Sequence, residues 1–187
     1  GTKIKSDGPL LVTHWGMSGP AILKLSAFGA KLLAEKNYEF KIHVNWVHEI
    51  NSELLMNEII RIIRDHPKKQ LPNYRPYLLP ERLWLYLLEK QDISPKKTWG
   101  ELSKKALNQL VNLLSNDIYS VKGKSPFKDE FVTCGGICLD SIDLSSLESR
   151  VCKNLYFAGE ILDIDGITGG YNFQAAWSTG FVAGQLR

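Results

Sequence analysis

The sequence has few cysteines and no long hydrophobic run. Three cysteines are an odd number, and no basic segment followed by an apolar stretch marks an export signal. We therefore expect a reducing, cytoplasmic compartment and no disulfide framework. Every apolar stretch is far shorter than the roughly 20 residues that cross a bilayer, so we expect no membrane partner.

The histidines and cysteines also lack the spacing of a metal site. The four histidines are scattered with no H-x-x-x-H pair. Cys134 and Cys138 stand in CGGIC, whose spacing fits neither a redox C-x-x-C pair nor half of a zinc site. We expect no metal and interpret these cysteines as small buried packing residues.

The charge is nearly balanced. The net charge is +3, and residues 47–116 supply the whole excess, with 11 Lys and Arg against 8 Asp and Glu. Three lysine pairs lie there, between or on expected helices, and no aromatic residues alternate with them as base stacking would require. They are Lys68–Lys69, Lys96–Lys97 and Lys104–Lys105. We interpret them as solvated surface, so a nucleic-acid partner is not expected.

The hydrophobic period changes twice along the chain, which predicts an α+β fold. Strands are predicted where apolar and polar residues alternate or where a short apolar run occurs, at 10–15, 38–46, 118–123, 130–136 and 154–159. The strands at 118–123 and 130–136 are predicted to form a hairpin. Helical spacing predicts helices beginning at Pro20, near Asn51, at Pro80, at the capping box Thr98-x-x-Glu101 and at Tyr171. We predict a strand-built unit (1–47 and 117–147) around a helical insertion (48–116), followed by a terminal piece (148–187).

The terminal piece contains a ligand-binding pattern, an apolar run that leads through glycines into a helix. Gly159 lets a ligand approach the backbone, and the Glu160 carboxylate after it can accept from sugar hydroxyls. Gly169 and Gly170 lead into a helix whose first amides favour an anionic or electron-rich oxygen. These residues are compatible with three alternatives. They could bind a phosphate, they could bind the polar edge of a flavin, or they could form a plain surface loop and helix cap that binds no ligand.

Four blocks, in order, carry a resemblance to a known family. They are LLVTHWGMSGPAILKLS, FVTCGGICLDSID, the Leu147-Glu148-Ser149 stretch and LYFAGEILDIDGITGGYNFQAAWSTGFVAG. This set resembles the BaiN-like, aminoacetone-oxidase-type bacterial FAD-dependent oxidoreductases. The resemblance implies a β-barrel-like unit with a helical insertion, followed by the returning strand, loop and helix of a split Rossmann-like FAD domain.

In that family a G-x-G-x-x-G segment for the pyrophosphate lies upstream, and this chain contains none. The resemblance therefore implies a piece whose partner is the missing amino-terminal FAD-binding segment. It implies a ribityl or pyrophosphate contact at Gly159 and Glu160, with Asp165 a further candidate. The implied contacts of the flavin ring edge are Gly169, Gly170, Tyr171, Asn172 and Phe173. Thr133, Gly135 and Gly136 match a segment near cofactor or substrate, although Cys134 departs from the family's usual small residue.

The expected function is hydride transfer through FAD, with NAD(P)H as the electron donor and a small organic substrate. His14, at a strand end before Gly-x-Ser-Gly-Pro, is the candidate proton donor; its alternative is a histidine bonded to backbone in a tight turn. Two other functions stay open. One is a non-catalytic module that binds a protein partner, and the other is an FAD protein that acts on RNA.

Overall fold

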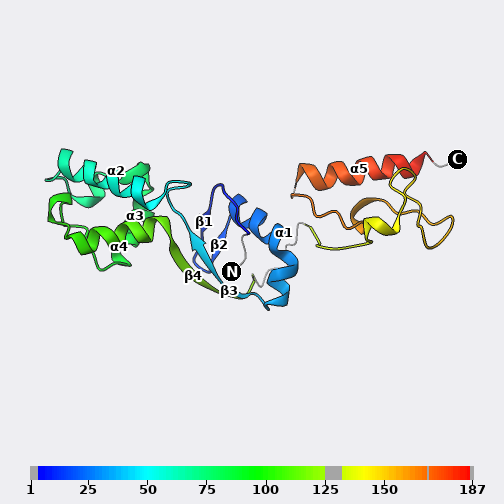
Figure 1. The fold of residues 1–187 in the computed structure, drawn as a ribbon, viewed down its shortest axis with the longest axis horizontal. Helices are drawn as coiled ribbons and strands as arrows, with labels where there is room; N and C mark the ends of the chain where they lie inside the picture. Colours follow the sequence, from blue (N-terminus) through cyan, green and yellow to red (C-terminus); the bar gives the residue numbers. More distant parts are fainter. Residues whose placement is uncertain (1–3, 125–131, 168, 186–187) are drawn as a thin grey trace. The chain divides into compact units, whose positions relative to one another are not determined.

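The computed structural model describes residues 4–124, 132–167 and 169–185 of the 187-residue chain. These residues form an α+β fold with five α-helices and four short strands (Figure 1). The helices are α1 (Pro20–Glu35), α2 (Ser52–Asp65), α3 (Glu81–Glu89), α4 (Lys104–Ser115) and α5 (Gly170–Gly184). The strands are β1 (Leu11–Val12), β2 (Met17–Ser18), β3 (Glu39–Val44) and β4 (Asp117–Lys122).

The chain divides into two compact units. One comprises residues 40–121, and the other comprises residues 1–39 together with 122–187. The first holds α2, α3 and α4, and we call it the helical unit. The second holds α1, the β1–β2 hairpin and α5, and we call it the split unit.

Sequence patterns and caps account for the helices of the helical unit. The Asn51 side chain accepts a hydrogen bond from the Leu54 amide at 2.8 Å and starts α2, as an N-cap residue should. The apolar positions at helical spacing, Leu55, Ile59 and Ile62, are buried. Pro80 stands at the N-cap of α3. The predictions of both helices are confirmed.

The third predicted helix begins later than its capping box indicated. The Thr98 and Glu101 pair does form that box, with the Thr98 amide donating to the Glu101 carboxylate at 2.6 Å. It caps only a short 3-10 helix, Trp99–Glu101. The α-helix α4 starts after Ser103, whose hydroxyl accepts from the Ala106 amide at 3.2 Å. The chain held two N-cap signals, and the second one begins the longer helix.

Two tryptophans lie at the centre of the helical unit. The Trp84 and Trp99 rings are fully buried and stacked, with centroids 5.9 Å apart. The Trp84 indole N–H donates to the Leu71 carbonyl at 2.9 Å, and the Trp99 indole N–H donates to the Tyr74 carbonyl at 3.0 Å. Because both polar atoms are satisfied, the pair buries a large apolar area without a desolvation penalty. The helical unit therefore has a hydrophobic core of its own.

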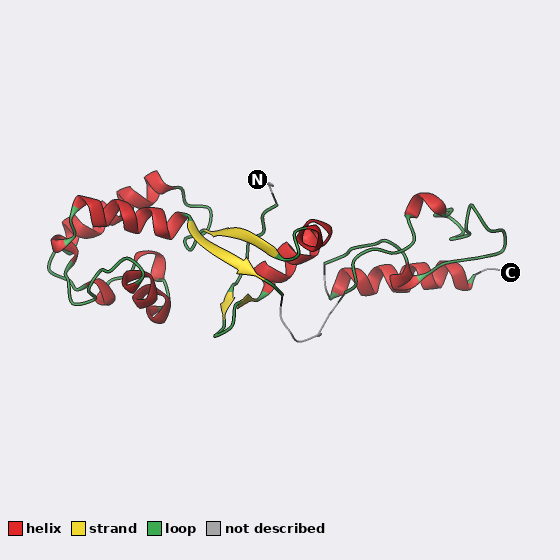
Figure 2. Cartoon of the chain, turned by 90° about the horizontal axis from the view of Figure 1, so that it is seen from below, coloured by secondary structure: helices red, strands yellow, loops and turns green. Residues whose placement is uncertain are grey.

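A two-stranded ribbon joins the helical unit to its flanking segments. β3 pairs with β4, and the two run side by side in Figures 1 and 2. Backbone bonds from Gly123 to Tyr38 (2.9 Å) and from Trp46 to Leu114 (2.8 Å) lie at its opposite ends, so the strands are antiparallel. On β3, Phe40 and Ile42 are half-buried and Val44 is buried while the residues between are exposed, as the alternation predicted.

The predicted hairpin between 118–123 and 130–136 is wrong, because β4 pairs with β3. Residues 125–131 lie outside the described residues, and 132–136 contain no strand. The pairing joins segments more than 70 residues apart in the sequence, and the local pattern cannot reveal such a partner. Among the described residues the strands form two separate two-stranded sheets, so a closed barrel is not seen within them.

The split unit begins with a hairpin and a helix. The predicted strand at 10–15 is shorter than expected: β1 pairs antiparallel with β2 through Leu11–Ser18 and Val12–Met17. A turn closed by the Thr13 amide and the Gly16 carbonyl (2.8 Å) lies between them. Pro20 then occupies the first turn of α1, where its missing N–H costs nothing.

The rest of the split unit is mostly loop packed against α5. Its small core is Ile142, Leu147 and Leu162, with Phe157 and Val182 among the residues around it. The predicted strand at 154–159 is wrong, since only a single bridge, Glu148 to Tyr156, forms there. The apolar side chains of that run pack as loop residues, and Asn154, at φ 64°, breaks the extended conformation at its start. The predicted terminal helix is confirmed by α5.

No helix in the part of the chain that the structure describes has the length and apolarity needed to span a bilayer.

Candidate cofactor-binding site

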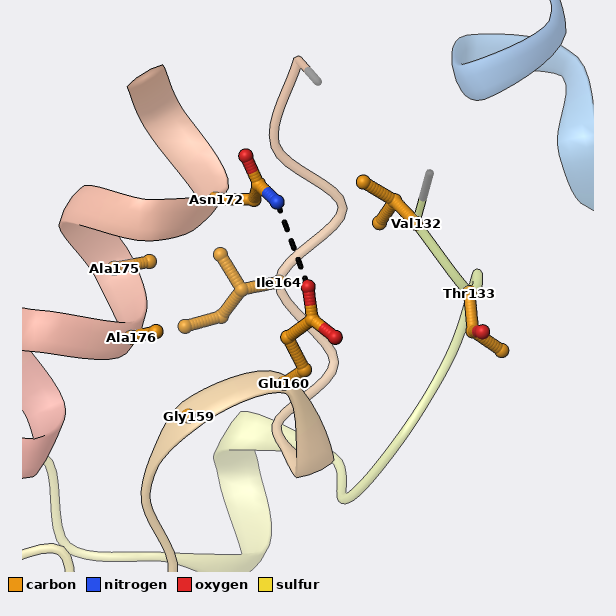
Figure 3. Close-up of a pocket in the computed structure, with 8 residues that line it drawn as sticks. All are labelled: Val132, Thr133, Gly159, Glu160, Ile164, Asn172, Ala175 and Ala176. Carbon is orange, nitrogen blue, oxygen red and sulfur yellow. Dashed lines mark hydrogen bonds between the residues drawn. The ribbon is translucent and has the colours of Figure 1, made fainter. Parts of the chain in front are cut away.

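A pocket in the split unit gathers residues from two of the four blocks that the sequence singled out. It is lined by Val132, Thr133, Gly159, Glu160, Ile164, Asn172, Ala175 and Ala176 (Figure 3). Three of these come from the first turns of α5, and the others come from the loops at 132–133 and 159–164. The fold therefore brings Thr133, Gly159, Glu160 and Asn172, four of the predicted cofactor contacts, to one place.

Thr179 on α5 fixes the loop at Gly159. The Gly159 amide donates to the Thr179 hydroxyl at 2.9 Å, and that hydroxyl donates to the Ala175 carbonyl at 2.7 Å. A Ser or Thr that bonds back into its own helix is common, but here the same oxygen also accepts from another segment. The loop is thereby attached to the middle of the helix.

Asn172 fixes the next residue of the same loop. Its side chain is buried, and its Oδ1 accepts from the Gly169 amide at 3.0 Å. Its Nδ2 donates to the Glu160 carboxylate at 3.4 Å, a long bond (Figure 3). Asn172 and Thr179 are seven residues apart, which places them on one face of α5 two turns from each other. This face therefore holds both Gly159 and Glu160.

The space around three glycines fits a ligand that approaches the backbone. A Cβ added to Gly159, Gly169 or Gly170 would meet no other atom within 4 Å. Gly159 has φ 82°, a conformation that L side chains rarely adopt. Glu160 is exposed beside them and offers carboxylate oxygens to hydroxyl donors. A polyol and an electron-rich ring edge match this set of donors and acceptors better than a phosphate, because the carboxylate would repel a phosphate.

The Gly169 amide, expected to contact the flavin ring edge, is hydrogen-bonded to Asn172. It donates to Asn172 within the first turn of α5, so it caps the helix. The amides that begin α5 after it, from Gly170 onward, have no carbonyl one turn earlier in the helix to bond to. Gly170 is therefore the better placed of the two glycines for a ligand contact.

The Asp165 carboxylate is hydrogen-bonded to other residues of the chain rather than lining the pocket. It accepts from the Cys134 thiol at 3.0 Å and from the Gly135 amide at 3.1 Å. The hydrogen bond to Asp165 raises the pKa of the Cys134 thiol, and burial and the negative charge of Asp165 add to it. Less of the Cys134 thiol is therefore ionised at neutral pH, and Asp165 positions the loop at 133–136 beside the pocket.

The second glycine of the CGGIC motif is explained by packing. A Cβ on Gly136 would lie 2.5 Å from the Ile161 carbonyl oxygen, too close for any side chain. Ile137 and Asp163 continue this contact, because the Ile137 amide donates to the Ile161 carbonyl and the Asp163 amide to the Ile137 carbonyl. The predicted burial of Cys134 and Cys138 is wrong, because both are exposed. In this segment glycine rather than cysteine permits the close packing.

Three other predicted residues lie away from the pocket lining. Tyr171 and Phe173 are 70% and 54% exposed on α5. His14 is exposed in the turn between β1 and β2, where its ring lies edge-on to Trp15 at 6.4 Å. In the described ranges, no three His, Cys, Asp or Glu side chains come together as a metal ion would need.

Sequence reasoning missed Thr179, although a signal was present. Asn172, Ala175, Ala176 and Thr179 have the i, i+3, i+4, i+7 spacing of one helix face. Two alanines between two hydrogen-bonding residues indicate a face against which backbone packs closely. Such a face positions a loop rather than a hydrophobic core.

Comparison with curated proteins finds relatives along nearly the whole chain. It is 31% identical over 94% of its length to the ribosomal RNA dihydrouridine synthase of Escherichia coli and covers 41% of that protein. It is 29% identical over 97% of its length to the 3-dehydro-bile acid delta(4,6)-reductase of Clostridium scindens and covers 44% of it. The ribosomal RNA dihydrouridine synthase of Haemophilus influenzae is 31% identical, over 92% of this chain and 40% of its own. The chain thus spans about two fifths of the length of these relatives.

A family model confirms the resemblance found in the sequence. The model described as the HI0933-like protein barrel and H2TH domain matches residues 1–132. That range contains the first of the four sequence blocks and the helical unit, and the match extends over more than half of the chain. The chain therefore belongs to the HI0933-like family, which is related to FAD-dependent oxidoreductases.

Proposed function

We propose that this chain forms the returning half of the FAD site of a flavin-dependent oxidoreductase. The observation that carries the proposal is the attachment of Gly159 and Glu160 to one face of α5 through Thr179 and Asn172. This attachment holds the Glu160 carboxylate beside the accessible backbone of Gly159 and the start of α5. Glu160 would accept from ribityl or ribose hydroxyls, and the Gly170 backbone would meet the flavin edge.

A second feature supports a further layer of protein over α5. Phe173, Trp177 and Phe181 follow one another at four-residue spacing and are 54%, 70% and 68% exposed. The Phe173 and Trp177 rings stack at 6.1 Å. Exposed aromatic stripes of this kind mark surfaces that pack against other protein. We propose that the covering layer is the amino-terminal segment of the FAD domain, and that further strands of that longer protein complete the barrel.

The proposed reaction is the reduction of a carbon–carbon double bond conjugated to a carbonyl. The names of the relatives describe two reactions of this kind. Dihydrouridine is uridine whose ring double bond has been saturated, and a delta(4,6)-reductase of a 3-dehydro compound saturates a dienone. Bound FAD supplies the hydride in this chemistry. The substrate then needs a proton, and His14 is the proposed donor. A nicotinamide nucleotide as electron source and a cytoplasmic location belong to the proposal through the family resemblance.

The test is FAD retention by variants of the full-length protein. Glu160→Ala should weaken FAD binding by about 1.5–3 kcal/mol, the range for a hydrogen bond to a charged group. Gly170→Val should do at least as much harm. A Cβ at Gly170 would meet open space in the chain itself, so Gly170→Ala, which adds that atom alone, is the companion variant that brings no clash within the chain. Asp140→Ala, at an exposed carboxylate in the short 3-10 helix Leu139–Ser141, is the matched control.

Flavin fluorescence after desalting measures the bound FAD, with circular dichroism as the folding check. Wild-type retention in both variants would remove the cofactor assignment. The 187-residue chain alone should purify without stoichiometric flavin, because only part of the site is present. A yellow chain after gel filtration would contradict the proposed division of the site.

Ribosomal RNA is the second candidate substrate class. Two of the three relatives reported above carry the name ribosomal RNA dihydrouridine synthase. The positive charge of the helical unit also favours it over a small molecule. Turnover of an RNA substrate against a small enone by the full-length protein separates the two classes.

A further inference from the structure

The lysine pairs of the helical unit do not lie on separate surfaces. Lys68–Lys69 and Lys96–Lys97 are far apart in the sequence, and each alone suggests ordinary solvated surface. Gln70 and Thr98 form an antiparallel bridge directly beside both pairs. The structure therefore joins the two pairs, and we call Lys68, Lys69, Lys96 and Lys97 the lysine cluster.

Backbone hydrogen bonds hold the two segments together on both sides of the bridge. The Leu71 amide donates to the Lys97 carbonyl at 3.0 Å, and the Trp99 amide donates to the Lys69 carbonyl at 3.0 Å. The Gly100 amide also donates to the Pro67 carbonyl at 2.9 Å. Leu71 and Trp99, each two residues after a lysine of the cluster, are fully buried in the core. The backbone beneath the lysines is consequently rigid, although their side chains are exposed.

The charge of the cluster is not neutralised within the described part of the chain. None of its four lysines takes part in a salt bridge there. The nearby acid Glu101 accepts from the Thr98 amide (2.6 Å) and hydroxyl (2.8 Å). These bonds and, to a smaller extent, the charge of Lys97 lower the pKa of the Glu101 carboxyl, so Glu101 offsets only part of the cluster's charge. Four positive side chains on two adjoining segments give this surface a local excess of positive charge, which an anion would offset.

Lys104 and Lys105 extend the same positive region along the chain. They are the first two residues of α4, and both are exposed. The first turn of a helix favours acidic residues because of the helix dipole, and the first turn of α4 contains none. Placing cations at this end costs stability, as expected where a surface is built to bind an anion.

We propose that the lysine cluster binds the phosphate backbone of RNA. The choice of RNA rests on the second candidate substrate class above. Lysine ammonium groups act as point charges toward phosphates and carry no base specificity. The aromatic residues beside the cluster fit this role, because Trp99 is buried and Tyr74 packs against His66 at 4.5 Å, so neither offers a face for base stacking. The cluster would position a structured RNA rather than select its sequence.

The experiment compares two quadruple variants of the 187-residue chain. One changes Lys68, Lys69, Lys96 and Lys97 to Gln, and the other changes four exposed lysines on other segments, Lys5, Lys36, Lys41 and Lys153, to Gln. Both lose the same charge. The probes are a fluorescein-labelled RNA hairpin and a DNA hairpin of the same sequence. Fluorescence anisotropy at several salt concentrations gives Kd and its salt dependence, and circular dichroism checks the fold.

The cluster variant should bind the RNA hairpin at least about 30-fold more weakly than the wild type at physiological salt. The slope of log Kd against log salt should fall by about 3, close to one for each lost phosphate contact. The control variant should stay within a few-fold of wild type. Equal losses in the two variants, no RNA binding by the wild type, or tighter binding of the DNA hairpin would overturn the proposal. FAD retention is measured in separate variants, so failure of the cofactor proposal is distinguishable from failure of this one.

Discussion

The contact between Asn172 and Glu160 can be tested by changing one atom. Asn172→Asp keeps the shape of the side chain but replaces the amide nitrogen, 3.4 Å from the Glu160 carboxylate, with a second carboxylate oxygen. At that distance the repulsion of two unit charges is as much as about 5 kcal/mol for an effective dielectric constant near 20. The N-terminus of α5 stabilises the new carboxylate at position 172 by up to about 1 kcal/mol, because a helix N-terminus favours an anion, and this offsets part of the repulsion.

The pair can escape the repulsion by taking up one proton, and this limits the cost. Protonating a carboxyl costs about 1.4 kcal/mol for each pH unit above its ordinary pKa near 4. The limit is therefore about 4 kcal/mol at pH 7 and about 1 kcal/mol at pH 5. After the offset from the helix, Asn172→Asp should destabilise the local structure by about 2–3 kcal/mol at pH 7 and by less than about 1 at pH 5.

Amide hydrogen exchange of peptides spanning residues 155–185 measures this local stability, since it reports opening of one region. Asn172→Ala is the comparison, because it loses the bond to Glu160, and also the bond from the Gly169 amide, but adds no charge, so its effect should not depend on pH. The double variant Asn172→Asp with Glu160→Gln removes the repulsion and should recover most of the loss. A loss that is the same at both pH values, or that the second substitution does not recover, would refute the contact.

Three further outcomes follow from the geometry. His14→Ala in the full-length protein should leave FAD bound and lower kcat; unchanged turnover would return His14 to the role of a turn residue. Asp117 is buried and accepts hydrogen bonds from the Lys90 ammonium group (2.6 Å) and the Trp46 indole N–H (3.0 Å). Asp117→Ala should therefore lower the unfolding free energy of the helical unit, measured by urea titration, by about 3–5 kcal/mol. A loss below about 1 kcal/mol would contradict this network. Because the bond to Asp165 raises the pKa of the Cys134 thiol, less thiolate is present at a given pH. Cys134 should react slowly with iodoacetamide near pH 8 and faster after Asp165→Asn, and equal rates would mean that the bond is absent in solution.

The helices could be predicted because their signals are local. The N-cap at Asn51 and the buried positions Leu55, Ile59 and Ile62 all lie within 12 residues of one another. Strand pairing was harder, since β4 finds its partner β3 across the whole helical unit. An apolar run such as 154–159 is also ambiguous, because loop residues packed under a helix can be as apolar as a strand.

The site could be predicted in part for a similar reason. The glycines and Glu160 belong to one continuous segment, so the pattern and the family resemblance both pointed to it. The roles of Asp165 and Thr179 depend on contacts between residues at least 20 positions apart in the sequence, which no spacing rule specifies. The lysine cluster was overlooked because each pair was considered by its own helix or loop. A bridge between Gln70 and Thr98 gives the pairs a common surface.

The stacked tryptophans of the helical unit have a spectroscopic consequence. Two stacked, buried indoles whose centroids lie 5.9 Å apart and whose planes are inclined by 23° should couple their transitions and give a strong near-ultraviolet circular dichroism signal. Trp177 on α5 and Trp15 between β1 and β2 are 70% and 51% exposed, so both should emit at longer wavelength and be quenched by iodide, while the buried pair is protected. Trp15→Phe leaves Trp177 as the exposed reporter of these two. The chain thus contains separate optical reporters for its two units. Loss of the dichroism signal marks unfolding around the stacked pair, and protection of Trp177 from iodide would report when another protein surface covers α5.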